Sequence, residues 1–171
     1  MDGARLFNAV VASGTDPARI VQDFDTVSIC LSKGLGAPVG SILVGSKADL
    51  TEAHRWRKMF GGGMRQAGVI ASAGIYALEN NIERLSEDHK RAKKFAEALD
   101  TMSHFSVNVE NVQSNIVFIG VEKGSTKRIM EKLSKHGVDV LDTDESTIRA
   151  VFHLHITDED LKNAIGAFGK I

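Results

Sequence analysis

The stretch Val27-Ser-Ile-Cys-Leu-Ser-Lys-Gly-Leu-Gly-Ala-Pro-Val-Gly40 decides the fold of this chain. Its first five residues, 27–31, have the length and the β-branched content of a short strand. Lys33 follows this strand, and the next seven residues include three glycines and a proline. A strand that ends in a glycine-rich turn presents its last side chains at the rim of a sheet. In open α/β sheets, that rim is where ligands bind.

A lysine with small neighbours allows a flat ligand to approach closely and is partly desolvated. Both conditions favour a nucleophilic amine over a solvated cation. The chemistry that Lys33 predicts is therefore a Schiff base with an aldehyde cofactor, pyridoxal phosphate above all. The alternative is a hairpin lysine that faces water, because a short motif of this kind often occurs without function.

The composition is typical of a globular protein with enough apolar mass for a core. Of the 171 residues, 43% are hydrophobic and 25% are charged, and the formal net charge is -1. Because basic residues are not in excess, the composition does not indicate electrostatic binding to nucleic acid or to an anionic membrane surface. It shows no signal-peptide pattern and no apolar run of membrane-spanning length, so we expect a soluble, cytoplasmic protein.

Cysteine and histidine usage does not favour disulfides or metal. Cys30 is the only cysteine, so it forms no internal disulfide, and we expect a small core residue. His153 and His155 would share one face of a strand as a candidate zinc pair. No third ligand is near them in the sequence, so we expect no metal site.

The spacing of apolar residues predicts two differently built halves. In the first, helices are expected over residues 5–13, 17–23, 47–59 and 66–80, with strands over 27–31 and 39–44. A charged amphipathic helix over 86–102 connects this half to a βαββα tail. Residues 105–109 alternate apolar with polar before it, and the tail itself has strands over 115–121, 138–141 and 148–155, and helices over 125–136 and 157–168.

Three segments carry a resemblance to a known family. Ser32-Lys-Gly-Leu-Gly-Ala-Pro-Val-Gly-Ser41 resembles the cofactor-lysine segment of the low-specificity L-threonine aldolases. Asp2-Gly-Ala-Arg-Leu-Phe-Asn-Ala9 resembles their aspartate motif, and Gly61-Gly-Gly-Met-Arg-Gln-Ala-Gly68 resembles their glycine-arginine motif. The matches stand in the family order and the resemblance covers essentially the whole chain. These aldolases form part of the β-eliminating-lyase branch of the fold-type I pyridoxal phosphate enzymes.

The resemblance implies an α/β fold, namely the C-terminal part of a fold-type I large domain plus a small α+β domain. Residues 1–88 would be the remainder of the cofactor-binding domain, and residues 89–171 the small C-terminal domain. Family members have a long N-terminal half before the aspartate motif, with a loop that grips the cofactor phosphate and a histidine that stacks on the ring. We therefore expect initiation at an internal methionine, a first strand short of neighbours, and weak cofactor binding by this chain alone.

The resemblance also assigns the site residues. Lys33 would be the catalytic amine, and Asp2 would hold the pyridinium nitrogen of pyridoxal phosphate in its protonated form. Arg149 would bind the substrate carboxylate, which a planar guanidinium fits bidentately. Arg5 is carried over as a second arginine near cofactor and substrate, and Arg65 as a contact of the cofactor phosphate. Asn115 is assigned to the substrate side. Without the resemblance, Arg5 and Arg65 would equally well be surface or ion-pair arginines.

The implied reaction is retro-aldol cleavage of L-threonine or L-allo-threonine to glycine and acetaldehyde. Such a carbon–carbon lyase would act in threonine catabolism and glycine biosynthesis, with a dimer or homotetramer as the family assembly. Two alternatives remain open. One is another fold-type I enzyme, such as an aminotransferase or γ-lyase, and the other is a non-catalytic fragment that associates with a full-length homologue.

Overall fold

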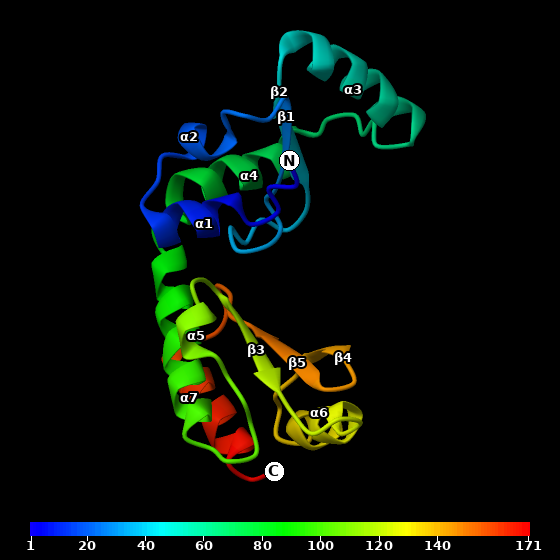
Figure 1. Ribbon diagram of the computed structural model, residues 1–171. Helices are drawn as coiled ribbons and strands as arrows, with labels where there is room; N and C mark the ends of the chain where they lie inside the picture. The colour runs from blue at the N-terminus through cyan, green and yellow to red at the C-terminus, as the bar shows by residue number, and fades with distance from the viewer. The chain divides into compact units, whose positions relative to one another are not determined.

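The computed structural model describes residues 1–171 and divides into two compact units, Met1–Leu85 and Ser86–Ile171 (Figure 1). Each unit has clusters of buried apolar residues of its own. None of the helices has both the length and the apolar character needed to cross a bilayer.

A two-stranded sheet organises the N-terminal unit. Strand β1 (Thr26–Cys30) pairs antiparallel with β2 (Ser41–Gly45), so that Thr26 lies opposite Gly45. Both strands are found within two residues of their predicted bounds. The backbone of residues 1–3 lies parallel to β1 at Ser28 and extends the pairing on its other side.

Two helices precede these strands in the chain and two follow them, and all four were predicted. They are α1 (Leu6–Ser13), α2 (Pro17–Val21), α3 (Lys47–Met59) and α4 (Gly68–Asn80). The side chain of Asp16 accepts a hydrogen bond from the Ala18 amide at the start of α2. The hydroxyl of Ser46 accepts one from the Asp49 amide at the start of α3. These caps satisfy amides that have no partner within the helix, which explains why both helices begin where they do.

Two apolar clusters hold the N-terminal unit together. Leu6 of α1 packs with Val27 and Ile29 of β1, and all three are buried. The second cluster contains Leu31, Leu35 and Ala37 from the loop after β1, together with Ala77 of α4 and Leu85. The loop that carries Lys33 is therefore anchored in a core at both ends.

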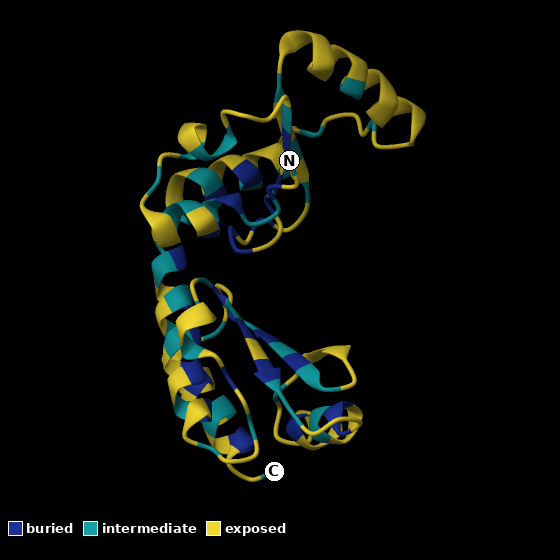
Figure 2. Ribbon diagram, in the orientation of Figure 1, coloured by how far each residue is buried: buried dark blue, intermediate teal, exposed yellow.

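Much of this unit is nevertheless exposed (Figure 2). Helix α3 has no buried residue, and its Trp56 stacks only on the neighbouring Phe60. On β2, Leu43 is 43% exposed and Val44 is 47% exposed. The expectation that the strand over 27–31 is short of neighbours and uncovered is wrong: its apolar residues Val27, Ile29 and Leu31 are buried, and β1 is paired with β2 on one side and with residues 1–3 on the other.

The C-terminal unit has the predicted βαββα order after its first helix. Its elements are α5 (Leu85–Asp100, whose first residue belongs to the other unit), a 3-10 turn (Val109–Asn111), β3 (Ile116–Gly120), α6 (Thr126–Ser134), β4 (Leu141–Asp144), β5 (Thr147–Val151) and α7 (Asp158–Phe168). The three strands form an antiparallel sheet in the order β3-β5-β4. Strand β5 is therefore central, with a partner on each side.

Two strand predictions in this half were misplaced. The alternating residues 105–109 form only an isolated bridge, from Ser106 to Gly120. The strand expected over 138–141 begins at Leu141, since segment 138–140 packs its valines against the core instead. Strand β5 ends at Val151, so His153 and His155 lie in the turn beyond it.

The core of this unit lies on one face of the sheet. Phe95 of α5 meets the rings of Phe152 and Phe168 edge to face, at centroid distances of 5.4 and 5.3 Å. Val117, Ile119, Ile148 and Leu133 are fully buried in the same cluster. Arg91 of α5 donates a hydrogen bond to Asp158 of α7 at 2.8 Å, which fixes the two helices at their polar edge.

A capping box begins helix α7 and gives the first prediction. The hydroxyl of Thr157 accepts from the Asp160 amide, and the Asp160 carboxylate accepts from the Thr157 amide and hydroxyl. The hydrogen bond from the Thr157 hydroxyl, and to a smaller extent that from the Thr157 amide, holds the pKa of Asp160 below its ordinary value. Thr157→Ala should lower the free energy of unfolding by about 1 kcal/mol, measured by urea denaturation at pH 7.

The same substitution should raise the pKa of Asp160, followed by NMR titration of its carboxyl group. The pKa of Asp160 is lower in the folded chain than in the unfolded chain. The stability that this carboxylate contributes is therefore fully present at a pH above its unfolded-state pKa, and it is lost as the pH falls through its folded-state pKa. Ser103→Ala, at an exposed position outside the helices, is the control. Equal stability losses in the two variants would contradict the capping role.

Candidate active site

Lys33 lies in a loop that the backbone closes on itself. The Leu31 amide donates to the Gly40 carbonyl at 3.0 Å, and the Ala37 amide donates back to the Leu31 carbonyl at 3.0 Å. Within this frame, the Gly36 amide donates to the Lys33 carbonyl at 2.9 Å, and Gly36 has a φ of +73°. Glycine adopts that conformation without strain. The Lys33 side chain is exposed on this short turn.

Asp2 is held beside β1 by two backbone hydrogen bonds. The Gly3 amide donates to the Ser28 carbonyl at 2.7 Å, and the Ser28 amide donates to the Met1 carbonyl at 3.0 Å. Residues paired across strands share a face, so Asp2 lies with the exposed Ser28, opposite the buried Val27. One carboxylate oxygen of Asp2 accepts from the Ala4 amide at 3.0 Å.

Residues 2–8, the segment that contains Asp2, also contact the loop that carries Lys33. A Cβ on Gly34 would lie 2.9 Å from the Asn8 side-chain oxygen and 3.0 Å from Leu85, so only glycine fits between them. Asn8 is 3% exposed in α1. Residues 2–8 therefore contact β1 at one end and the residue after Lys33 at the other.

Asn8 is a positioning residue that the sequence reading did not single out. A polar residue inside the apolar spacing of α1 is the signal that could have found it.

Arg5 stands at the position just before α1, between these two contacts. Its Nε is buried and has no hydrogen-bond partner. A buried guanidinium nitrogen without an acceptor is costly, and a bound anion or carbonyl would satisfy it. This favours a binding role for Arg5 over that of a solvated surface arginine.

The residues present fit a pyridoxal phosphate group. An exposed amine, a carboxylate and a guanidinium with an unsatisfied nitrogen lie on two segments that contact one another. At Gly3 and Gly34 the two segments approach their neighbours too closely for a side chain. At Gly3, a Cβ would lie 3.0 Å from both Val27 and the Ser28 carbonyl.

Arg65 follows the glycine run 61–63 and is exposed. Gly62 and Gly63 let the chain turn back on the end of α3, since a Cβ at Gly63 would lie 2.6 Å from the Lys58 side chain. No hydrogen bond or ion pair joins Arg65 to Lys33 or Asp2. The structure does not bring Arg65 to these residues, and its contact with a phosphate stays a prediction.

Arg149 belongs to the C-terminal unit, at the centre of β5. Strand pairing places it between Phe118 of β3 and Leu141 of β4, which are 55% and 56% exposed. Its neighbours Ile148 and Ala150 face the core, so Arg149 projects from the opposite face. Its Nε is buried and has no partner. An arginine with an unpaired donor between apolar side chains is suited to bind a carboxylate.

Asn115 has a clear structural role. Asn115 is 2% exposed, and its side-chain amide donates to the backbone carbonyl of Phe152 at 2.7 Å. The backbone carbonyl of Asn115 accepts from the Phe152 amide at 2.8 Å. These bonds join the start of β3 to the end of β5. Alternation along β3 puts Asn115 on the face of the buried Val117, opposite that of Arg149. Its side-chain oxygen has no partner, and its contact with a substrate stays a prediction.

The histidine pair is not a metal site in this structure. The rings of His153 and His155 are 5.7 Å apart, but they lie in a turn and not on one strand face. No group of three or more His, Cys, Asp or Glu side chains is placed to hold a metal ion. Cys30 is half-buried in β1, where the Ser41 hydroxyl lies 3.5 Å from its sulfur.

A family model described as β-eliminating lyase matches residues 1–122. The chain belongs to the β-eliminating lyase family. Pyridoxal phosphate is the cofactor of this family. Among curated relatives, low-specificity L-threonine aldolase 1 of Arabidopsis thaliana is 43% identical over 171 residues, which cover 98% of this chain and 48% of that protein. The low specificity L-threonine aldolase of Escherichia coli K12 is 45% identical over 161 residues, or 94% of this chain and 47% of the relative.

This β-eliminating lyase chain thus spans about half the length of the curated relatives it matches. Solved structures show the fold. A Leishmania major threonine aldolase superimposes with a TM-score of 0.76 at 18% identity, over 99% of this chain and 50% of that one. A Sphingomonas wittichii serine palmitoyltransferase gives a TM-score of 0.70, also at 18% identity, over 90% and 41% of the two chains. The fold is that of the fold-type I pyridoxal phosphate enzymes, as predicted.

The contact between Gly34 and Asn8 gives a test of the site's framework. Gly34→Ala should lower the free energy of unfolding by about 1–3 kcal/mol, because the added methyl group meets both Asn8 and Leu85. The matched control is Gly68→Ala at the start of α4, where an added Cβ meets nothing within 4 Å. The control should be neutral or slightly stabilising. Equal losses in the two variants, measured by urea denaturation, would show that the contact is absent.

Proposed function

We propose that this chain is the C-terminal part of a pyridoxal phosphate-dependent aldehyde lyase that cleaves L-threonine and L-allo-threonine to glycine and acetaldehyde. One observation carries the proposal: the segment with Asp2 and Arg5 contacts both β1 and the loop of Lys33. The relatives named as threonine aldolases share 43–45% identity across this region. When bound, the cofactor supplies an aldehyde for an amine and an electron-accepting ring.

In this proposal, Lys33 holds the cofactor aldehyde and its ammonium group must lose a proton before it reacts. Gly34 and Gly36, which follow Lys33 in the turn, let a flat ring approach the amine. The carboxylate of Asp2 would accept a hydrogen bond from the ring nitrogen and so keep that nitrogen protonated. The oxygen of Asp2 that Ala4 does not occupy serves this bond.

The arginines are proposed to bind the anionic groups. Arg149 holds the substrate carboxylate through its planar guanidinium, and the apolar pair Phe118 and Leu141 keeps water from competing. Arg5 contributes its unsatisfied Nε near cofactor and substrate. Arg65 is assigned to the cofactor phosphate and Asn115 to the substrate side.

The remaining assignments follow from family membership. Residues 1–88 act as the remainder of the cofactor-binding domain, and residues 89–171 as the small domain. The complete enzyme is proposed to be a cytoplasmic homo-oligomer, a dimer or homotetramer, with roles in threonine catabolism and glycine biosynthesis.

The role of Lys33 is tested by borohydride reduction of the chain mixed with pyridoxal phosphate, followed by peptide mass analysis. We expect the pyridoxyl label on Lys33, its loss in Lys33→Ala, and no change in Lys47→Ala, a lysine at the start of α3. Label on another lysine, or equal label in Lys33→Ala, would refute the assignment.

Because the chain spans about half of its relatives, we expect incomplete occupancy and little threonine cleavage from it alone. Absorbance of the bound cofactor and release of acetaldehyde measure these two quantities. Full occupancy with threonine cleavage would contradict this expectation but would support the lyase assignment. Keto acid formation in place of acetaldehyde would instead indicate an aminotransferase.

A second function is favoured by the uncovered apolar surface of the N-terminal unit. We propose, as the alternative, that the chain is non-catalytic and associates with a full-length homologue. Its large exposed side chains include Leu43 and Val44 on β2, Trp56 and Phe60 at α3, and Tyr76 on α4. Burying these apolar side chains against another chain would be favourable.

Native mass spectrometry tests this alternative. The chain is mixed with the full-length Escherichia coli relative, and we expect a mixed complex that Val44→Lys weakens. Lys135→Ser, on the exposed end of α6, serves as the control and should leave the complex unchanged. Absence of any mixed complex would exclude the alternative.

A further inference from the structure

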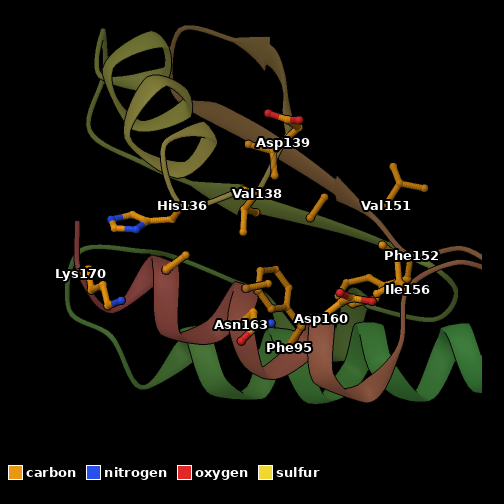
Figure 3. A pocket seen from close by; sticks show the side chains of 15 residues that line it. Phe95, His136, Val138, Asp139, Val151, Phe152, Ile156, Asp160, Asn163 and Lys170 are labelled. Carbon is orange, nitrogen blue, oxygen red and sulfur yellow. The ribbon is translucent and has the colours of Figure 1, made fainter.

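The C-terminal unit contains a cavity of about 370 Å³, lined by none of the residues proposed for cofactor or substrate. It lies between segment 136–140, strand β5 and helix α7, with the ring of Phe95 on its floor (Figure 3). Pockets that bind small organic molecules have volumes of about 300–1,000 Å³. This cavity is therefore large enough for a small ligand.

The middle of the cavity is apolar. Phe95, Phe152 and Ala167 are buried there, and Val138 and Ile156 are half-buried. In Figure 3, the side chain of Val138 points into the space above Phe95. An apolar wall in contact with water is favourably covered by the apolar body of a ligand.

One end of the cavity carries free hydrogen-bond donors. Figure 3 places the imidazole of His136 and the ammonium of Lys170 at the same end. Neither side chain has an ion pair or side-chain hydrogen bond. The backbone amides of Gly137 and Lys170 are already bonded, to the carbonyls of Ser134 at 2.9 Å and Ala167 at 3.1 Å, so the free donors at this end are the two side chains. This end therefore offers donors and positive charge to an acceptor.

The acidic side chains of the cavity wall are placed so that they do not cancel this charge. Asp160 lies at the other end in Figure 3, and its carboxylate is bonded to Thr157. Asp139 projects its carboxylate away from the space between β5 and α7. A negative charge on the ligand is thus favoured beside Lys170 and disfavoured beside Asp160, which fixes the direction of binding.

We propose that this cavity binds a small aliphatic monocarboxylic acid. Its apolar chain lies against Phe95 and Val138, and its carboxylate accepts hydrogen bonds from Lys170 and His136. The site is independent of the proposed lyase function, because it involves neither the cofactor nor Lys33, Asp2 or Arg149.

The proposal has two parts, the contact of the apolar chain and the contact of the carboxylate. They are tested separately by adding octanoate or 1-octanol to the whole 171-residue chain without cofactor. Isothermal titration calorimetry should show octanoate binding, with 1-octanol about tenfold weaker because it lacks the charge. Lys170→Met should weaken octanoate about tenfold and leave 1-octanol unchanged. Lys162→Met, at a lysine of α7 that does not line the cavity, is the matched control and should change neither affinity.

The cavity itself is tested by filling it. Ala164→Leu should abolish binding of both ligands, and the circular dichroism spectrum should remain that of the parent chain. If this variant unfolds, amide chemical shifts of the parent chain decide: octanoate should shift residues that line the cavity and not those elsewhere. Absence of binding, equal binding of the two ligands, equal effects of the two lysine variants, or shifts outside the cavity would each overturn the proposal.

Discussion

The pairing of residues 1–3 with Ser28 is the constraint on which the N-terminal unit depends. Two backbone hydrogen bonds set the register, and a slip of one residue would turn Asp2 from the exposed face of β1 to the face that α1 covers. Gly3 protects that register, because any side chain there would collide with Val27 and the Ser28 carbonyl. The positions of Asp2 and Arg5 relative to β1 thus follow from backbone geometry and not from side-chain contacts.

The sequence predicted the elements whose local signals agree. Helix α3 has the predicted bounds because Ser46 caps its start and glycines follow its end. Segment 105–109 alternates apolar with polar as a strand does, yet it forms no ladder with a second strand. Val107 and Val109 pack against the core, and alternation alone does not show whether a partner strand is present. The contact of Asn8 with Gly34, and the turning of Asn115 toward the core, are tertiary packing that no local pattern encodes.

The two faces of the C-terminal sheet differ: one is packed against the core, and the other carries Arg149. Ile148 and Ala150 of β5 bury themselves in the core, while Arg149 between them projects to the other side. Its flanking residues Phe118 and Leu141 lower the polarity around the guanidinium, and a charge pair is stronger where water is displaced. The strand that fixes the core therefore also fixes the direction of the arginine.

The outer edge of β2 has a further consequence for the chain in solution. No strand of this chain pairs with that edge, so a row of amide and carbonyl groups stands open beside Leu43 and Val44. Such an edge is a template for strand addition between copies, and proteins ordinarily block it with charge, proline or a covering element. We therefore expect copies of this chain to associate through β2 when the chain is concentrated.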